Sequence, residues 1–258
     1  MAYALITGAS GGIGLAMAQE LAKRKIDLLL VARSVERLSE AQQKLTATHG
    51  IKVEYLSTDL SLAGSAKTVF NWTAENNFNV SILINNAGYG TWGEVANTPV
   101  ETLTNMMQLN MNTLVEMCHL FLPELKKQPA SYILNVASTA AYQAVPTLSV
   151  YAASKAFVVL FTRGLKRELK NTSVSVTCVS PGATSTNFVS RAGMDAMKER
   201  AEKFSMPADV VAKIAINGMF KHKTEVITGF ANWLTAQLTY FVPKSITEWV
   251  AESLYKTP

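Results

Sequence analysis

Short apolar runs alternate along the chain with longer segments of helical period. The runs are bounded by turn residues, and they are Tyr3–Ile6, Leu28–Val31, Val53–Leu56, Ile82–Ile84, Tyr132–Leu134, Val174–Thr177 and, more weakly, Glu225–Ile227. Most of them are continuous apolar strings, which is typical of strands that are covered on both faces. The segments between them include Leu15–Lys25, Val35–Thr48 and Ala63–Asn76, and each is long enough for a helix. This strict alternation predicts an α/β fold in three layers, with a doubly wound parallel sheet of about seven strands and helices on both faces.

Two segments depart from this alternation. The stretch at about 183–206 mixes small, polar and charged residues after a strand end, and such a stretch is often a mobile cover over a site. The second, Phe230–Val242, carries no charged side chain and several large apolar ones. We expect the C-terminal segment, 229–258, to pack on the domain or on a second subunit, and contact with a membrane surface or a lipid substrate is the less favoured alternative. No linker, repeat or low-complexity segment is visible, so residues 1–258 are expected to form one domain.

Composition and charge narrow the class of protein. Hydrophobic residues make up 48% and charged residues only 17%, which excludes a disordered chain. The net charge of +5 is mild and its cations fall into short groups at expected helix ends, so no nucleic-acid partner is expected. Cys118 and Cys178 lie far apart in apolar stretches, which favours buried core thiols over a disulfide or a metal site. Because the chain shows neither an apolar run of membrane-spanning length nor an N-terminal leader pattern, we expect a cytoplasmic protein.

A glycine-rich turn follows the first strand directly. Residues 7–14 read Thr-Gly-Ala-Ser-Gly-Gly-Ile-Gly, and a helical segment follows them. Because Gly8, Gly12 and Gly14 have no side chains, backbone N–H groups can approach a phosphate here. The partial positive charge at the start of the helix, around Ile13, favours the same anion. Such a turn can also be purely structural, but its place between a strand and a helix favours phosphate binding.

The end of the second strand indicates which dinucleotide is bound. An acidic residue at this place would accept hydrogen bonds from the adenosine ribose. The chain instead has Ala32 and then Arg33, and a guanidinium suits a phosphate through bidentate, charge-assisted hydrogen bonds. Ser10 in the glycine turn could donate to the same phosphate. The sequence therefore favours NADP(H) over NAD(H), with a surface arginine that ends a strand as the alternative.

These features, with others further along, resemble the short-chain dehydrogenase/reductase family in its compact single-domain branch. The resemblance runs from about residue 3 to residue 190 and is weaker beyond that. Its motifs occur in order: the glycine pattern at Thr7, Gly8, Gly12 and Gly14; the adenine-site pair Asp59 and Leu60; the N-N-A-G turn Asn85, Asn86, Ala87 and Gly88; the helix asparagine Asn110; the serine Ser138; the Y-x-x-x-K pair Tyr151 and Lys155; and the turn Pro181-Gly182, with Thr186 after it. Each motif is weak alone, but their order and spacing together are specific. The resemblance implies a Rossmann-type fold, a cofactor held by these turns, and catalysis by Asn110, Ser138, Tyr151 and Lys155.

The spacing of the tyrosine and the lysine has its own chemical meaning. Tyr151 and Lys155 lie four residues apart at the start of the helical segment Ala152–Leu169, so they share a face of the helix. A phenol with an ordinary pKa near 10 is a poor base at neutral pH, but a neighbouring ammonium ion favours the phenolate. Tyr151 could then exchange a proton with a substrate oxygen. A tyrosine–lysine pair alone is more often an ordinary surface contact than a catalytic pair. The presence of the glycine turn and of Ser138 makes the catalytic interpretation the favoured one here.

Two further polar residues complete the expected site. Ser138 follows an apolar strand that ends near Val136, at the edge where sites of doubly wound sheets open, and its hydroxyl could bond a developing alkoxide. Capping of the next turn is the alternative role for Ser138. Asn110 lies in an otherwise apolar helix, and a buried asparagine needs partners. The resemblance implies that it holds a water joined to Lys155 in a proton relay, and a satisfied core asparagine is the alternative.

The sequence thus predicts an NADPH-dependent enzyme that reduces a ketone or aldehyde to an alcohol, or catalyses the reverse. The candidate residues for the substrate pocket precede or follow strand ends, and they are Tyr89, Trp92, Tyr142, Gln143 and the loop after Gly182. They suggest an apolar or bulky small-molecule carbonyl compound, and the resemblance extends to 3-oxoacyl and hydroxysteroid-type reductases. A non-catalytic NADP(H)-binding redox sensor is the alternative. A nucleotide-sugar epimerase would need a larger substrate domain than the residues after Pro181 supply.

The helix after Tyr151 is apolar on nearly its whole circumference, which is typical of a buried helix. One side of it can pack on the sheet and the other on a second subunit. The resemblance implies a dimer interface at this helix, so we expect a homodimer or homotetramer. Coverage of the helix by the C-terminal segment of the same chain is the alternative.

Overall fold

The computed structural model describes residues 2–186, 188, 192–193 and 205–255, and it contains one seven-stranded sheet. Its strands are β1 (Tyr3–Thr7), β2 (Asp27–Ala32), β3 (Val53–Ser57), β4 (Val80–Asn85), β5 (Ser131–Val136), β6 (Val174–Ser180) and β7 (Glu225–Ile227). All seven predicted strands are present, and all but β7 extend by one to three residues beyond the apolar run that predicted them. All six neighbouring pairs are parallel, in the order β3-β2-β1-β4-β5-β6-β7. The expected doubly wound parallel sheet is therefore confirmed.

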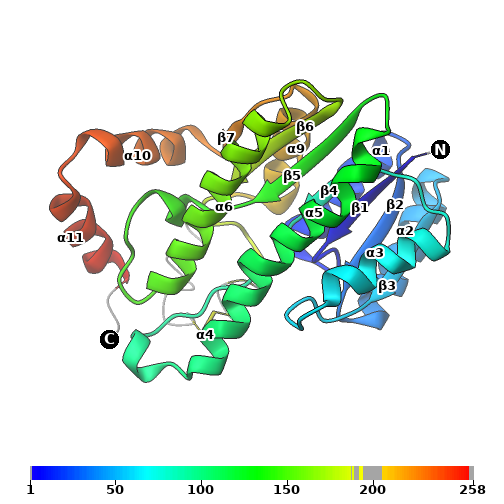
Figure 1. Ribbon diagram of the computed structural model, residues 1–258. Helices are drawn as coiled ribbons and strands as arrows, with labels where there is room; N and C mark the ends of the chain where they lie inside the picture. Colours follow the sequence, from blue (N-terminus) through cyan, green and yellow to red (C-terminus); the bar gives the residue numbers. More distant parts are fainter. Residues whose placement is uncertain (1, 187, 189–191, 194–204, 256–258) are drawn as a thin grey trace.

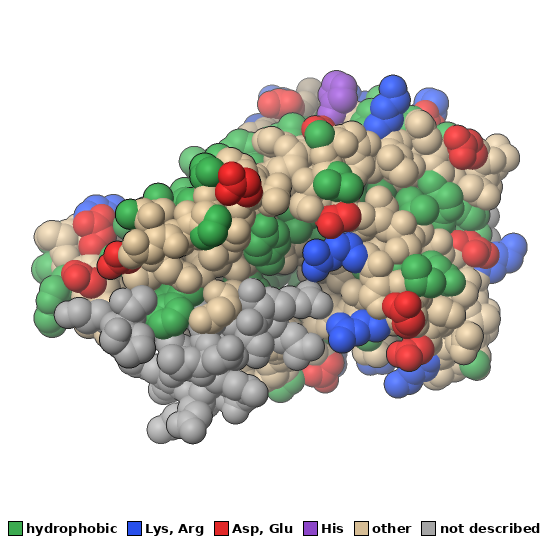
Figure 2. Space-filling view, turned by 90° about the horizontal axis from the view of Figure 1, so that it is seen from below, with side chains coloured by type: hydrophobic (Ala, Val, Ile, Leu, Met, Phe, Trp, Pro, Cys, Tyr) green, Lys and Arg blue, Asp and Glu red, His purple; other side chains and the backbone are tan. Residues whose placement is uncertain are grey.

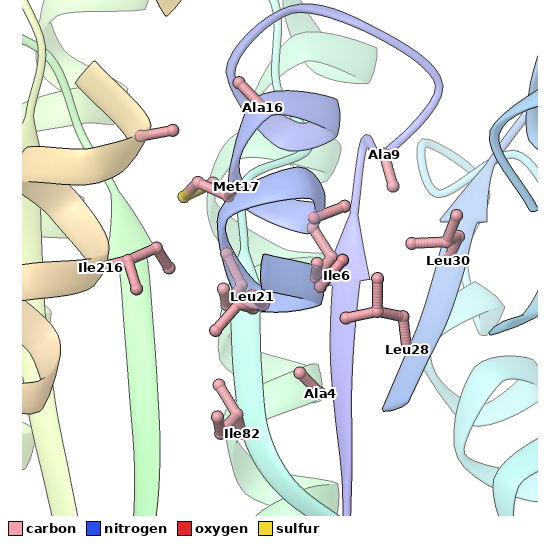
Figure 3. Close-up of a cluster of buried hydrophobic side chains, with 14 of the residues drawn as sticks. Ala4, Ile6, Ala9, Ala16, Met17, Leu21, Leu28, Leu30, Ile82 and Ile216 are labelled. Carbon is pink, nitrogen blue, oxygen red and sulfur yellow. The ribbon is translucent and has the colours of Figure 1, made fainter. Parts of the chain in front are cut away.

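Helices cover both faces of the sheet, which gives three layers (Figure 1). The helices of one face are α1 (Gly12–Lys23), α2 (Val35–His49) and α9 (Ala208–Phe220), and those of the other are α3 (Ser65–Glu75), α5 (Thr113–Lys126) and α6 (Ser149–Glu168). Figure 3 shows how the first face packs: Ile6 of β1 and Leu28 of β2 lie opposite Leu21 of α1, and all three are fully buried. The continuous apolar runs of the strands are explained by this burial on two sides.

The chain reverses its direction of winding at β1. It adds β2 and β3 on one side of β1, and then returns to add β4 and the later strands on the other side. Because all the strands are parallel, their carboxyl ends meet at one edge of the sheet. The turns after β1 and β4 are neighbours at this edge, and this is the place where doubly wound sheets bind ligands. Figure 2 views the molecule from below, and hydrophobic side chains line a recess near the centre of that face.

A long helical stretch beside this edge contains an irregular turn. The helix α4 (Val100–Met107) passes into α5 through a π-helical turn at Gln108–Asn112. Asn110 lies within that turn and is buried. A π turn widens the helix locally, and such turns occur frequently at functional sites.

The C-terminal segment packs only partly on the rest of the chain. It forms α10 (Phe230–Phe241) and α11 (Lys244–Tyr255), which extend along one end of the molecule (Figure 1). On α10 the small residues Ala236 and Thr239 are buried, whereas Phe230 and Phe241 are 75% and 83% exposed. The aromatic side chains at the two ends of α10 are therefore largely uncovered by the rest of the chain. No helix in the described part of the chain is long and apolar enough to span a membrane.

One face of α6 is likewise uncovered. Its residues Val158, Val159 and Leu165 are buried against the sheet, but Leu160 is 71% exposed. Within a single chain this helix is therefore buried on its sheet-facing side only, and cover of the other side by a second subunit stays a prediction. Since Leu160 remains exposed with both C-terminal helices in place, coverage by the C-terminal segment does not explain the apolar character of α6.

Candidate active site

The glycine turn after β1 is fixed to the turn after β4 by one threonine. The Thr7 hydroxyl accepts hydrogen bonds from the backbone N–H groups of Asn86 and Ala87, at 2.9 and 3.0 Å, and donates to Ile84 O at 3.3 Å. The Asn86 side chain donates in return to Thr7 O at 2.9 Å. The two turns that the sequence predicted to contact a cofactor are therefore one rigid unit at the carboxyl edge of the sheet.

The glycines of this turn are required by geometry. Gly12 has φ +55°, a backbone conformation that favours glycine, and a Cβ on Gly14 would lie 2.4 Å from Gly8 O. The first turn of α1, which begins at Gly12, contains no acidic residue, and no side chain caps it. Its N–H groups and its partial positive charge thus face the carboxyl edge without a side-chain acceptor. This arrangement fits the phosphates of a dinucleotide, with Gly8, Ser10, Gly12, Ile13 and Gly14 around them.

Arg33 and Asp59 lie together on the other side of the glycine turn, at the ends of β2 and β3. Arg33 Nη1 is 3.8 Å from Asp59 Oδ2, and the two side chains are 70% and 36% exposed. Partial burial opposes ionisation of Asp59, but hydrogen bonds from Ser61 and the charge of Arg33 outweigh it, so the pKa of Asp59 is lowered. An exposed ion pair of this kind contributes little stability, so Arg33 can turn to a stronger anion at small cost. Leu60 is different, because its side chain is buried in the core and its carbonyl accepts from Thr113 Oγ1 at 2.8 Å.

Lys155 is a cation in the interior of the protein. Its side chain is buried, Nζ donates to Val136 O at 3.0 Å, and Nζ lies 5.9 Å from the centroid of the Tyr151 ring. Burial of the ammonium group is the main reason why the pKa of Lys155 falls from 10.5 to about 8. At neutral pH the side chain still carries its charge for most of the time. The structure therefore brings Tyr151 and Lys155 together on one face of α6, as their spacing predicts.

Asn110 is held by the protein on all sides. Its side-chain amide donates to Tyr89 O at 3.0 Å and to Ser154 Oγ at 3.1 Å, and its oxygen accepts from Tyr89 N at 3.2 Å. Ser154 donates in turn to Tyr151 O at 2.7 Å, so Asn110 connects the π turn to the start of α6. A Cβ on Gly88 would lie 2.9 Å from the Asn110 oxygen and 3.2 Å from Lys155 Nζ, which places all three groups together. These bonds show a supporting role for the side chain, and the water relay to Lys155 stays a prediction.

Ser138 begins a short 3-10 helix, η3 (Thr139–Tyr142), after the carboxyl end of β5. Its Oγ accepts from Ala140 N at 3.1 Å, which caps the helix and leaves the hydroxyl proton available to a substrate oxygen. The capping role and the catalytic role, which the sequence left as alternatives, are therefore compatible. The helix η3 packs against α6, the helix that carries Tyr151.

Comparison with known proteins assigns the family. A family model for the short chain dehydrogenases matches residues 2–201. The chain belongs to the short-chain dehydrogenase family. It is 32% identical over 202 residues to a very-long-chain 3-oxoacyl-CoA reductase of Anas platyrhynchos, which covers 75% of this chain and 64% of that protein.

Two solved structures show the same architecture. A short-chain dehydrogenase from Sphingobium yanoikuyae, in complex with NADPH, is 30% identical, has a TM-score of 0.82, and aligns over 93% of this chain and 94% of its own. A member of the family from Burkholderia phymatum, in complex with NAD, is 23% identical with a TM-score of 0.87, over 96% and 95% of the two chains. The Rossmann-type fold expected from the sequence is confirmed.

The remaining motif residues of this short-chain dehydrogenase close the site beyond β6. Pro181 O accepts from Thr139 N at 2.9 Å, and a Cβ on Gly182 would lie 2.3 Å from the Asn232 side chain of α10. Thr186 reaches the glycine turn, because a Cβ on Gly12 would lie 3.2 Å from its methyl group. Much of the expected substrate loop at 183–206 lies outside the described residues, but a bridge between Thr184 and Met206 joins its two ends.

A separate cluster of apolar residues surrounds Tyr151. Its buried members are Met106, Val145, Leu148, Tyr151, Ala152 and Ala192, with Tyr89, Trp92 and Phe188 among the half-buried residues packed on them. Tyr89 and Trp92 thus lie close to Tyr151, the tyrosine that the sequence predicts to be catalytic. Tyr142 does not, because it is buried in the core of the α5 and α6 face, with its hydroxyl bonded to Ser180 and Glu225.

Sequence reasoning missed two supporting residues of this site. The sequence indicates Thr7 only as part of the glycine motif, and it indicates no role for Ser154, although this residue lies between Tyr151 and Lys155. The available signal was a small hydroxyl residue in an otherwise apolar strand or helix face, because a buried hydroxyl needs a partner.

Replacement of Thr7 tests the bond between the two turns. Thr7→Val keeps the shape of the side chain but leaves the N–H groups of Asn86 and Ala87 without their acceptor, so we expect a loss of about 2–4 kcal/mol in the free energy of unfolding. Thr7→Ser keeps the hydroxyl and should lose only about 1 kcal/mol. Urea denaturation, followed by tryptophan fluorescence, measures both. Equal stability of the two variants would contradict this role.

Proposed function

We propose that this short-chain dehydrogenase is an NADPH-dependent reductase of an apolar or bulky carbonyl compound, and that it also catalyses the reverse oxidation. The observation that carries the proposal is the buried ammonium of Lys155, 5.9 Å from the ring centroid of Tyr151 at the carboxyl edge of the sheet. A buried charge without an ionic partner costs stability, and functional sites are where such charges are commonly found.

Different groups of residues would bind different parts of the cofactor. The glycine turn and the N-terminus of α1 would hold the pyrophosphate, and Asp59 would lie at the adenine. Asn86, Ala87 and Gly88 would contact the nicotinamide ribose and the nicotinamide ring. Pro181, Gly182 and Thr186 would contact the other side of that ring. When bound, NADPH supplies the hydride that reduces the carbonyl carbon.

The protein's own groups handle the proton. Tyr151 gives its hydroxyl proton to the carbonyl oxygen as that oxygen gains negative charge, and Ser138 donates a hydrogen bond to the same oxygen. The phenolate left on Tyr151 is then stabilised by the charge of Lys155. In the oxidation direction the same phenolate accepts the proton of the alcohol. General acid catalysis of this kind typically contributes about 10²–10⁴-fold to the rate.

The cluster around Tyr151 supports the choice of an apolar substrate. Apolar and aromatic side chains lie beside Tyr151, and they are Val145, Leu148, Tyr89, Trp92 and Phe188. An apolar pocket with few polar groups binds a bulky apolar substrate by burial of its surface. The similarity to a very-long-chain 3-oxoacyl-CoA reductase agrees with this substrate class.

We further propose that the protein is a homodimer or homotetramer. The exposed face of α6 around Leu160 and Phe157, and the exposed apolar side of α10, are surfaces that a second subunit would cover.

Tyr151→Phe tests the catalytic assignment. The variant lacks the proton that Tyr151 donates, so we expect turnover to fall by at least about 10²-fold, while NADPH affinity changes by less than about twofold. NADPH oxidation with a panel of ketones, aldehydes and 3-oxoacyl thioesters measures turnover, and nucleotide fluorescence measures binding. Retained turnover in the variant would refute the assignment. NADPH binding by the wild type without turnover of any carbonyl would instead favour a redox sensor.

Arg33→Asp tests the coenzyme preference. Loss of a charge-assisted bidentate contact to a phosphate costs about 1.5–3 kcal/mol, so we expect NADPH affinity to fall by about 10- to 100-fold and the preference to move toward NADH. Arg37→Asp, one helical turn further on an exposed part of α2, makes the same change in net charge and is the matched control. Equal effects of the two variants would mean that Arg33 does not read the phosphate.

A further inference from the structure

A buried carboxylate contact fixes the end of the short helix that Ser138 begins. Tyr142, the last residue of η3, is only 8% exposed. Its hydroxyl is hydrogen-bonded to the carboxylate of Glu225 and lies 2.9 Å from Ser180 Oγ. The phenol has one proton, and the carboxylate is the stronger acceptor, so Tyr142 donates to Glu225. Burial and this contact raise the pKa of Tyr142, so it remains a donor at every pH that the protein encounters.

The two carboxylate oxygens of Glu225 interact with different elements of the structure. Oε1 accepts from Tyr142, while Oε2 lies 3.7 Å from Nη1 of Arg163 on α6. Glu225 is the first residue of β7, at the edge of the sheet, where it pairs with Cys178 of β6. Its side chain is 22% exposed and borders a pocket of about 390 Å³ that Arg163, Trp233 and Tyr240 also line. The carboxylate therefore connects η3 to the sheet edge and to α6.

The helix η3 packs against α6, and it is also held at each of its two ends. It is four residues long, and one 3-10 turn has little stability of its own. Its N-terminal end is held by the hydrogen bond from Thr139 N to Pro181 O at 2.9 Å, and its C-terminal end by Tyr142. Because Ser138 caps this same turn, we expect a shift of Tyr142 to displace the hydroxyl of Ser138 as well. A displacement of about 1 Å at a reacting group can lower a rate by about 10²-fold.

We propose that Glu225 is a positioning residue for Ser138: through Tyr142 it fixes the 3-10 turn and so sets where the Ser138 hydroxyl meets the substrate oxygen. This assignment rests on the proposed function. It differs from a purely structural role of Glu225 in one respect. A positioning residue loses its effect on the rate when Ser138 has no hydroxyl to position, whereas a structural residue does not.

The test is a set of variants in two backgrounds. In the wild-type background, Glu225→Ala should lower kcat by about 10-fold or more per NADPH-binding site, with NADPH affinity within about twofold of the wild type. Glu225→Gln should restore most of the rate, because its amide oxygen still accepts from Tyr142. In the Ser138→Ala background, Glu225→Ala should lower the remaining rate by less than about twofold. Tyr142→Phe keeps the buried ring but removes the hydroxyl. It should lower kcat in the wild-type background and have almost no effect in the Ser138→Ala background, and it serves as the test if Glu225→Ala does not fold.

A matched control removes a hydroxyl at the opposite end of a strand. Tyr132 lies near the start of β5, far from Ser138, so Tyr132→Phe should leave kcat unchanged. Equal rate losses for Glu225→Ala, or for Tyr142→Phe, in the two backgrounds would overturn the proposal, as would no loss in either. Wild-type turnover in both Ser138→Ala and Tyr151→Phe would show instead that the proposed function is wrong.

Discussion

The site depends on an ammonium ion that the fold keeps away from water. Among the described residues no carboxylate forms an ion pair with Lys155, whose ammonium group donates to the carbonyl of Val136 and faces the ring of Tyr151. Such a cation opposes folding, since burial favours its neutral form. In the proposed reaction its benefit comes when Tyr151 loses a proton, because the phenolate would then lie beside a positive charge in surroundings where electrostatic interactions are strong. Stability is thus exchanged for chemistry at this one position.

The parallel sheet brings the parts of the site together. All its strands end at one edge, so the turns after β1, β4, β5 and β6 can each contribute a different function there. The glycine turn of β1 offers N–H groups, Thr7 fixes it to the turn of β4, β5 leads to Ser138, and β6 leads to Pro181. Tyr151 and Lys155 come from α6, which packs beneath these turns. The distances between the groups are set by strand register and by a few buried hydrogen bonds, rather than by flexible loops.

The sequence predicts the framework of this arrangement but not its connections. Apolar runs predict all seven strands, and the four-residue spacing places Tyr151 and Lys155 on one face, because both depend on local periodicity. The connections are hydrogen bonds between residues that lie far apart in the chain, so no local pattern reveals them. They join Thr7 to Asn86, Asn110 to Ser154, and Tyr142 to Glu225. Tyr142 was misplaced in the substrate pocket for this reason. The exposure of Leu160 shows a further limit, because an apolar position does not reveal whether its cover comes from the same chain.

The most direct test of this account is an NMR titration of the lysine side chains in isotopically labelled protein, with the signal of Lys155 identified by its loss in Lys155→Met. Burial predicts a midpoint of about 8 for Lys155, against 10.5 for a lysine in water. A midpoint near 10.5 would contradict the account, because the amine would then lie in water, where its charge has little influence on Tyr151.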